Sequence, residues 1–216
     1  MEFFKKLKCY ESNYSLVVTV HPDNSFGEGV FMAQIVVEKK AKKYTYEDYC
    51  KISDEKRYEL IEGELLMTPS PITKHQRISG KLEFILRRFL TENNLGELFY
   101  APYDVCFDNE NVVQPDILFI SKDRAEIVGE KNVQGAPDLV IEIVSESSAY
   151  RDMVQKKKLY AKFGVKEYWI VIPESEEIAV YTLKDKTYQL CKAYGKGNTL
   201  ESSLLKGLKI GLMDIF

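Results

Sequence analysis

Two strand-like segments of this chain each contain an acidic residue beside or within an apolar run, and a lysine-rich segment follows the second. In segment 112–120 the acid is Asp116, which directly follows a proline, and in segment 137–144 it is Glu142, between two isoleucines. Three consecutive lysines occupy positions 156–158. A lone carboxylate is costly to bury unless it has a partner or a cation. Two acids and a lysine brought together by two strands and a helix would supply what a divalent-metal phosphodiesterase requires.

Each of these residues also has an ordinary structural explanation. Asp116 could be the exposed acid of a Pro-Asp turn, and the lysines could form a solvated helix face. Alternation along a strand places Ile141 and Ile143 on the face opposite Glu142, so this side chain could face solvent from a half-exposed sheet. Neither acid alone indicates a catalytic site, and it is their combination with the lysine-rich helix that favours one.

The order of the predicted elements indicates an α/β domain with a mixed sheet. From residue 73 onward the pattern predicts a helix, three strands, a helix and a further strand, as expected when helices pack on a sheet. The expected elements are a helix at 45–52, a hairpin of 57–61 and 64–68, a helix from 73 to about 93–96, strands at 97–107, 112–120 and 137–144, a helix at 149–163, and strands at 167–172, 178–183 and 188–193.

Turn and capping residues define several of these boundaries. Thr45 suits the N-cap of the first helix. Glu62-Gly63 suits a two-residue hairpin turn, because glycine accepts positive φ angles. Residues 73–76 have a capping-box pattern at the start of the long helix, and Gly164 suits the C-terminal cap of the later one.

Length and composition exclude some classes of protein. A chain of 216 residues can bury the core of one domain, and its 30 basic and 33 acidic residues give a net charge of −3. No overall field therefore attracts nucleic acid or a membrane, although a local basic groove is compatible with this count. No apolar run approaches the roughly 18 to 20 residues that span a bilayer, and no secretory segment is visible. We expect a cytoplasmic protein without membrane association.

The four cysteines are widely separated and form no CxxC pair, so we expect reduced thiols rather than disulfides or metal ligands. They are Cys9, Cys50, Cys106 and Cys191.

Residues 1–43 differ from the rest of the chain and are predicted to be an N-terminal extension or arm. The first 31 residues show no clear period, and Met32 resembles a fresh start, followed by a lysine-rich connector at 39–43. Either the native protein begins at Met32, or residues 1–31 are a loosely packed arm. We expect the main domain to occupy residues 44–216.

Five short segments of that domain together resemble a known family. They are 57–64 (RYELIEGE), 75–76 (HQ), 113–116 (VQPD), 136–142 (APDLVIE) and 164–171 (GVKEYWIV). In this order they resemble the bacterial Uma-two restriction-endonuclease family of the PD-(D/E)xK nuclease superfamily. The resemblance implies a restriction-endonuclease-like α/β core, with a mixed central sheet flanked by helices and extra β-hairpins.

The resemblance also implies an activity and a site. It implies a Mg²⁺- or Mn²⁺-dependent endonuclease that hydrolyses phosphodiester bonds of DNA. Asp116 and Glu142 would be catalytic and would bind the metal. Glu59 would be either a further metal ligand or a solvent-facing residue of the hairpin. A hard cation such as Mg²⁺ prefers these oxygen ligands. The resemblance leaves open whether the protein forms a homodimer.

The catalytic lysine departs from the general superfamily motif, which would place it at Val144. In the resembling family the lysine lies on the following helix, in an Asp-x-x-x-Lys-x-x-x-Tyr pattern that corresponds here to Asp152, Lys156 and Tyr160. Residues four apart share a helix face. Helix geometry alone does not choose Lys156 over Lys157, but the family pattern does. Replacing Lys156 by alanine would then abolish cleavage and leave the fold nearly unchanged.

The apolar face of this helix is predicted to lie nearer Lys157 than Lys156. The residues that mark that face are Tyr150, Met153, Val154 and Ala161.

Several other residues are weaker candidates. Glu64 is a second acid of the hairpin, and Gln114 could either hydrogen-bond near the site or cap a strand. His75 could contact phosphate through the first turn of its helix, or be structural. Trp169 is predicted to pack in the core rather than to stack on bases.

A protein of another class would keep this fold without catalysis and serve as a nucleic-acid-binding or interaction module. Val144 at the usual lysine position favours that alternative, whereas the joint presence of Asp116, Glu142 and Lys156 favours the enzyme. A small-molecule hydrolase has no support, because no Ser-His-Asp or Cys-His constellation is visible.

Overall fold

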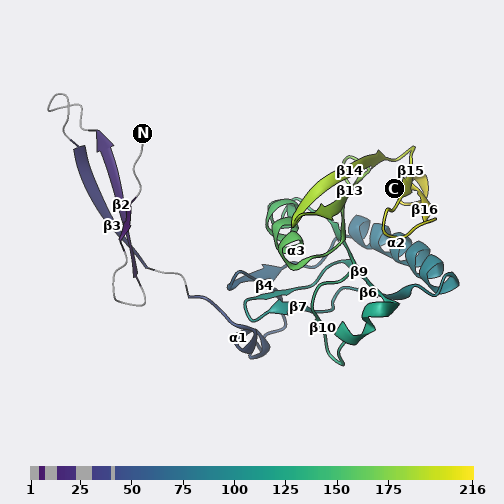
Figure 1. Ribbon diagram of the computed structural model, residues 1–216, viewed down its shortest axis with the longest axis horizontal. Coiled ribbons are helices and arrows are strands. Elements are labelled where there is room, and N and C mark those ends of the chain that lie inside the picture. The colour runs from purple at the N-terminus through teal and green to yellow at the C-terminus, as the bar shows by residue number, and fades with distance from the viewer. Residues whose placement is uncertain (1–4, 8–13, 23–30, 40–41) are drawn as a thin grey trace. The chain divides into compact units, whose positions relative to one another are not determined.

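The computed structural model divides into two compact units, residues 1–43 and 44–216 (Figure 1). The residues that it describes are 5–7, 14–22, 31–39 and 42–216. The remaining residues of the predicted N-terminal extension lie outside this set.

The first unit contains a three-stranded antiparallel sheet of β1 (Lys5–Leu7), β2 (Tyr14–Pro22) and β3 (Phe31–Lys39). No element is predicted for residues 1–31 from their sequence, and the structure corrects this. Both longer strands contain valine-rich runs, whose branched side chains favour extended backbone. Met32 lies within β3.

The second unit is built on a six-stranded mixed sheet. In spatial order its strands are β14 (Thr187–Gly195), β13 (Glu177–Lys184), β12 (Glu167–Ile172), β11 (Leu139–Ile143), β9 (Ile117–Ser121) and β6 (Gly96–Tyr100). The β11–β12 pair is parallel, and the other neighbours in the sheet are antiparallel. The predicted mixed α/β architecture is therefore confirmed.

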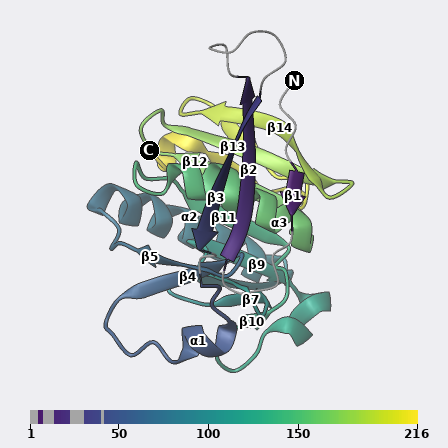
Figure 2. The same ribbon diagram turned by 90° about the vertical axis from the view of Figure 1, so that its left-hand side faces the viewer.

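A five-stranded sheet packs beside it. In spatial order its strands are β10 (Val133–Gln134), β7 (Val105–Asp108), β8 (Asn111–Val113), β4 (Arg57–Ile61) and β5 (Glu64–Thr68). In Figures 1 and 2 the strands β4, β7 and β10 lie together, away from β13 and β14. The shorter elements are η1 (Lys122–Ile127), β15 (Thr199–Glu201), β16 (Lys209–Gly211) and η3 (Leu212–Asp214).

Two predicted strands are each divided between the two sheets. The predicted strand 97–107 becomes β6 and β7, and the cis peptide before Pro102 lies between them. The predicted strand 112–120 becomes β8 and β9, separated by a segment that contains Pro115. Proline has no amide hydrogen to donate to a ladder, so both strands break where the chain passes between sheets. Asp116 follows the second break directly.

The structure confirms two of the predicted capping and turn features and contradicts a third. Thr45 caps α1 (Tyr46–Cys50) with a reciprocal capping box to Asp48, and Glu62 and Gly63 have positive φ angles between β4 and β5. Both predictions are confirmed. The capping box at Thr73 is wrong: α2 (Thr73–Glu92) starts after Ile72 and has no side-chain cap.

Two apolar cores lie on opposite faces of the six-stranded sheet. One contains the buried face of α2, the β15–β16 pair and, from β11, Leu139, Ile141 and Ile143. The other contains α3 (Lys157–Phe163), residues of the five-stranded sheet and Val140. Alternation along β11 therefore places Glu142 on the face that meets α3 and the five-stranded sheet.

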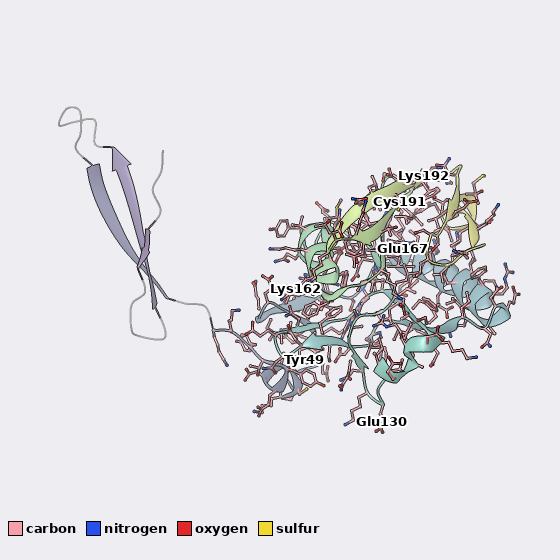
Figure 3. All side chains as sticks on the ribbon, in the orientation of Figure 1. Tyr49, Glu130, Lys162, Glu167, Cys191 and Lys192 are labelled. Carbon is pink, nitrogen blue, oxygen red and sulfur yellow. The ribbon has the colours of Figure 1, made fainter. Side chains whose placement is uncertain are left out.

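Glu167, labelled in Figure 3, shows how this fold accommodates a buried acid without a cation. Its carboxylate accepts hydrogen bonds from the Trp169 indole, the Ser202 and Ser203 hydroxyls, and the amides of Ser203 and Leu204. These neutral donors attach the segment before β16 to β12. Glu167 is thus a structural acid.

Two glycines provide a test of the backbone assignments. Gly164 ends α3 with φ of 92°, and Gly80 lies within α2 with open space around its missing Cβ. We expect Gly164→Ala to destabilise the fold by about 1–2 kcal/mol, because an L-residue is strained in that conformation. Gly80→Ala should stabilise it by about 0.5–1 kcal/mol, because alanine loses less entropy in a helix. Urea unfolding of both variants measures this pair, and shifts of the same sign would contradict it.

Candidate active site

The two acids identified from the sequence line one cavity of about 480 Å³ in the second unit. It lies where β4, the segments that flank β9 and β11, and the first turn of α2 meet η2 (Arg151–Lys156). Its charged lining residues are Arg57, Glu59, His75, Asp116, Glu142, Arg151, Asp152 and Lys156. Four carboxylates thus face three permanently basic side chains and one histidine.

Asp116 and Glu142 lie on the same face of the six-stranded sheet. Strands β9 and β11 are antiparallel with Ile117 opposite Ile141, so the register continued by one residue places Asp116 opposite Glu142. The Oδ2 atom of Asp116 accepts a hydrogen bond of 2.7 Å from the Ile143 amide. Cross-strand neighbours on one face are close together, so the sheet itself positions both carboxylates.

Glu142 is almost fully buried, with 3% of its surface exposed. Its Oε1 atom lies 3.0 Å from the Lys156 ammonium and accepts a hydrogen bond of 2.5 Å from the Tyr160 hydroxyl. Burial raises the pKa of Glu142 well above its usual range; the charge of Lys156 opposes this shift, and nearby carboxylates including Asp152 and Asp116 reinforce it. An additional cation would relieve this repulsion.

Lys156 connects three carboxylates. Its Nζ atom lies 2.7 Å from Glu59 Oε1, 3.0 Å from Glu142 Oε1 and 3.6 Å from Asp152 Oδ1. Burial lowers the pKa of this ammonium, but the charges of the three acids outweigh burial and hold the pKa well above its usual range. Lys156 is therefore a fixed cation and hydrogen-bond donor rather than a general base.

Glu59 holds the basic groups of the site in place. It is 1% exposed, and its Oε1 atom also accepts a hydrogen bond of 2.9 Å from the backbone amide of Gln114. Its Oε2 atom accepts one of 3.3 Å from Arg151. Both carboxylate oxygens thus have partners within the protein. A direct contact between Glu59 and a metal remains a prediction.

The side chain of Gln114 links the site to α1 and to the segment before β7. Its amide nitrogen donates to Asp104 at 2.8 Å, and its oxygen accepts from Arg57 at 3.1 Å. The hydroxyl of Tyr49, a residue labelled in Figure 3, also donates to Asp104 at 2.9 Å. Of the two roles considered for Gln114, the structure supports hydrogen bonding beside the site.

His75 projects from the first turn of α2 towards Asp116. Its Nε2 atom lies 3.1 Å from Asp116 Oδ2, and within the described residues its Nδ1 atom is buried without a hydrogen-bond partner. Burial lowers the pKa of His75, but the hydrogen bond to Asp116 and the charges of Asp116 and Asp152 outweigh it, so the net shift is upward. The imidazole thus contacts the same oxygen of Asp116, Oδ2, that accepts the hydrogen bond from the Ile143 amide.

The helix predicted at 149–163 is not a single α-helix. Its first part, η2, is a π-helix, and α3 continues it from Lys157 to Phe163. The Tyr168 hydroxyl donates to the backbone oxygen of Asp152 at 2.9 Å. A wider helical turn of this kind is often found at functional sites, and here it contains Arg151, Asp152 and Lys156.

The predicted apolar face of this helix is wrong at three of its four residues, and of the four Ala161 is buried as predicted. Tyr150, Met153 and Val154 are exposed by 69%, 41% and 48%, whereas Asp152 and Lys156 are buried. The buried charges of the site, rather than these apolar residues, determine which side faces inward.

The positions of the other lysines, of Glu64 and of Trp169 show which of these residues lie near the cavity. Lys157 lies 3.6 Å from the centre of the Tyr181 ring and Lys158 is exposed, so Lys156 is the lysine of the triplet that lines the cavity. Glu64 is exposed on β5 and lies outside the cavity lining. Trp169 is fully buried in the core, as predicted.

Sequence patterns did not identify Arg151. An arginine at a helix start is common, and its contact with Glu59 joins residues 92 positions apart, a distance over which local periodicity carries no information. Asp152 and Tyr160 were part of the helix pattern, and the contact of Asp152 with Lys156, four residues later, is local to the helix. The contact of Tyr160 with Glu142 joins residues 18 positions apart and depends on the packing of the helix against β11.

The donor set is compatible with Mg²⁺. No group of three or more His, Cys, Asp and Glu side chains has metal-binding geometry within the described residues. Magnesium is usually held by only one or two carboxylates together with water and substrate phosphates. Asp116 and Glu142 supply two carboxylates that line one cavity. These residues therefore fit a hard divalent cation whose coordination the substrate completes.

Residues 44–213 match the model of the Uma2 family, described as "Putative restriction endonuclease". The chain belongs to this family. The family points to a nuclease. No curated protein matches this Uma2-family chain.

A solved structure supports the fold of this Uma2-family protein. The crystal structure of a putative nuclease belonging to DUF820 from Anabaena variabilis superposes with a TM-score of 0.68 at 20% sequence identity. The match covers 80% of this chain and 97% of that one. Within the part of the chain described here, no helix combines the length and apolar character needed to cross a membrane.

Proposed function

We propose that this protein is a metal-dependent endonuclease that hydrolyses phosphodiester bonds of DNA, with Mg²⁺ or Mn²⁺ as cofactor. The observation that carries the proposal is the position of Lys156: a buried, protonated lysine between Glu59 and Glu142, in the cavity that Asp116 also lines. Membership of the restriction-endonuclease family and the nuclease fold support it.

Asp116 and Glu142 would hold the metal, and Glu59 is a third candidate ligand. When bound, the metal would polarise the phosphate and lower the pKa of an attacking water. The hydrogen bond from Ile143 and the contact with His75 keep the Asp116 carboxylate in one orientation. A ligand that is already oriented loses little freedom when the cation binds.

Lys156 would stabilise negative charge that develops on the phosphate. It is held by three carboxylates, so it needs no reorganisation during the reaction. Its raised pKa makes it a donor rather than a base, and we therefore do not assign to it the removal of a proton from water. Arg151, which also contacts Glu59, lines the same cavity and adds positive charge for the phosphate.

Purified protein should cleave plasmid or single-stranded DNA in the presence of Mg²⁺ or Mn²⁺, and cleavage should stop when EDTA is added. Gel electrophoresis of both substrates, with calorimetric titration of Mn²⁺, measures cleavage and metal binding separately. Absence of cleavage together with absence of Mn²⁺ binding would favour the nuclease-fold binding module that lacks catalysis.

A further inference from the structure

A second cavity of about 560 Å³ borders the candidate site. It lies between the C-terminal half of α2 and β6, the edge strand of the six-stranded sheet. Tyr100 and Pro102 line both this cavity and the site cavity. The two cavities thus share two lining residues at the end of β6.

Tyr100 lines both cavities, and its aromatic ring is exposed to solvent. It is 56% exposed and pairs with Ile117, the residue after Asp116. The following amide, that of Ala101, donates to the Asp116 backbone oxygen at 3.1 Å. Phe99, by contrast, stacks on Tyr103 and packs against the core. Tyr100 is therefore an exposed aromatic side chain held one strand away from a predicted catalytic acid.

Arginines accompany the exposed aromatic residues of this surface. The Arg87 guanidinium lies 5.9 Å from the centre of the Tyr100 ring, and that of Arg88 lies 5.8 Å from the centre of the Phe84 ring. Phe84 is 63% exposed. Glu83 neutralises part of the charge of Arg87 through an ion pair.

The exposed side of α2 adds further positive charge. Arg77, Lys81, Phe84 and Arg88 recur at intervals of three and four residues, so they share one face of the helix. All four are exposed. A chain with a net charge of −3 therefore presents a local basic face on α2, the helix that also contributes Arg87 to the second cavity.

We propose that the second cavity binds an unpaired nucleotide of the substrate strand, with its base stacked on Tyr100 and its phosphate near Arg87. This rests on the proposed nuclease function. Proteins that bind single strands combine a positive groove with aromatic platforms, because every base has a π-face. Glu97 lines the same cavity, where its carboxylate can accept a hydrogen bond from an exocyclic amino group of a base.

A peptide strand added to the edge of β6 is the less favoured occupant. Such a strand would need the outward carbonyl groups of β6. The Arg87 guanidinium already donates to the Leu98 backbone oxygen at 3.2 Å, in the middle of β6. The arginine thus covers the edge that a partner strand would use and also supplies a cation for phosphate.

The test measures binding without cleavage. A fluorescent single-stranded DNA of about 12 nucleotides, within usual site sizes, is titrated in EDTA and in Ca²⁺ by anisotropy. A second oligonucleotide carries 2-aminopurine at successive positions, and stacking quenches its fluorescence. We expect Tyr100→Leu to raise Kd about tenfold and to remove quenching, whereas Tyr100→Phe binds like wild type. Arg87→Gln should weaken binding and reduce its salt dependence.

Tyr150→Leu is the matched control, since Tyr150 is 69% exposed and lines neither cavity. Equal Kd values for Tyr100→Leu and wild type would overturn the proposal, as would a wild-type protein that binds no single strand. A dimer seen by sedimentation, with oligonucleotide affinity independent of Tyr100, would indicate strand pairing at β6 instead. Binding through Tyr100 without cleavage under any metal would refute the nuclease function and leave the subsite intact.

Discussion

We expect Lys156→Ala to lower the rate of metal-dependent DNA cleavage by about 10²–10³-fold, the usual cost of losing one donor that stabilises a transition state. The lysine is protonated, buried and fixed by three acids, so no other side chain of the triplet can replace it. Lys158→Ala is the matched control, because Lys158 is exposed on the same helix. Single-turnover cleavage of a labelled DNA compares the two variants.

The same substitution should also destabilise the protein, and here the structure changes an expectation drawn from sequence. From the sequence, we expected Lys156→Ala to leave the fold nearly unchanged. Its ammonium instead lies within 3.6 Å of Glu59, Glu142 and Asp152, all of them buried. Leaving buried charges without a partner costs about 3–5 kcal/mol. Rates must therefore be measured below the thermal transition of the variant, with circular dichroism to establish that it is folded.

Stability and chemistry can be separated by the pattern of results. A folded Lys156→Ala variant that binds Mn²⁺ but cleaves slowly would support the catalytic role. A folded variant that cleaves as fast as wild type would rule out Lys156 as the catalytic lysine, whatever its effect on stability.

Local chemistry predicted the parts of the fold that depend on a few neighbouring residues. The β4–β5 hairpin follows from Glu62-Gly63, because those two residues alone supply the positive φ angles. The α1 cap follows from Thr45 and Asp48, three positions apart. The end of α3 follows from Gly164. Each of these features can be recognised without knowing what packs against it.

The division of two predicted strands between two sheets could not be found in this way. An apolar run interrupted by proline reads as one strand with an irregular point. Only the pairing partners distinguish a bulge from a crossing, and those partners, such as Ile117 with Ile141, are distant in sequence. The crossing matters because it places Asp116 at the end of β9, beside the first turn of α2.

The sequence indicated the two acids of the candidate site but not the network of ion pairs and hydrogen bonds around them. Strand alternation around Glu142 predicted that the carboxylate would lie opposite the isoleucines, and it does. The choice of Lys156 over Lys157 needed the resemblance to a family, because helix geometry favoured neither. The contacts of Arg151 and Gln114 with Glu59 arise from the packing of β4 against η2 and β8, which no local pattern encodes.

Asp116→Asn should abolish both Mn²⁺ binding and cleavage while preserving the fold. Asparagine has nearly the same shape, and its side-chain oxygen can still accept the hydrogen bond from the Ile143 amide. What it loses is the negative charge that a hard cation requires. Even outer residues of metal sites typically contribute 10–100-fold to affinity, so loss of a direct ligand should weaken Mn²⁺ binding by more than about 100-fold. Calorimetry measures the affinity, and the DNA assay measures the rate.

Glu64→Gln is the control for this prediction, because it removes one negative charge from an exposed position outside the cavity. It should leave metal affinity and cleavage unchanged, which separates a ligand effect from a general change in charge. Unaltered Mn²⁺ binding in Asp116→Asn would place the metal elsewhere and remove Asp116 from the site. Loss of Mn²⁺ binding with retained cleavage would separate hydrolysis from the metal. Loss of both, with a normal thermal transition, is the result that the sheet geometry around Asp116 and Glu142 leads us to expect.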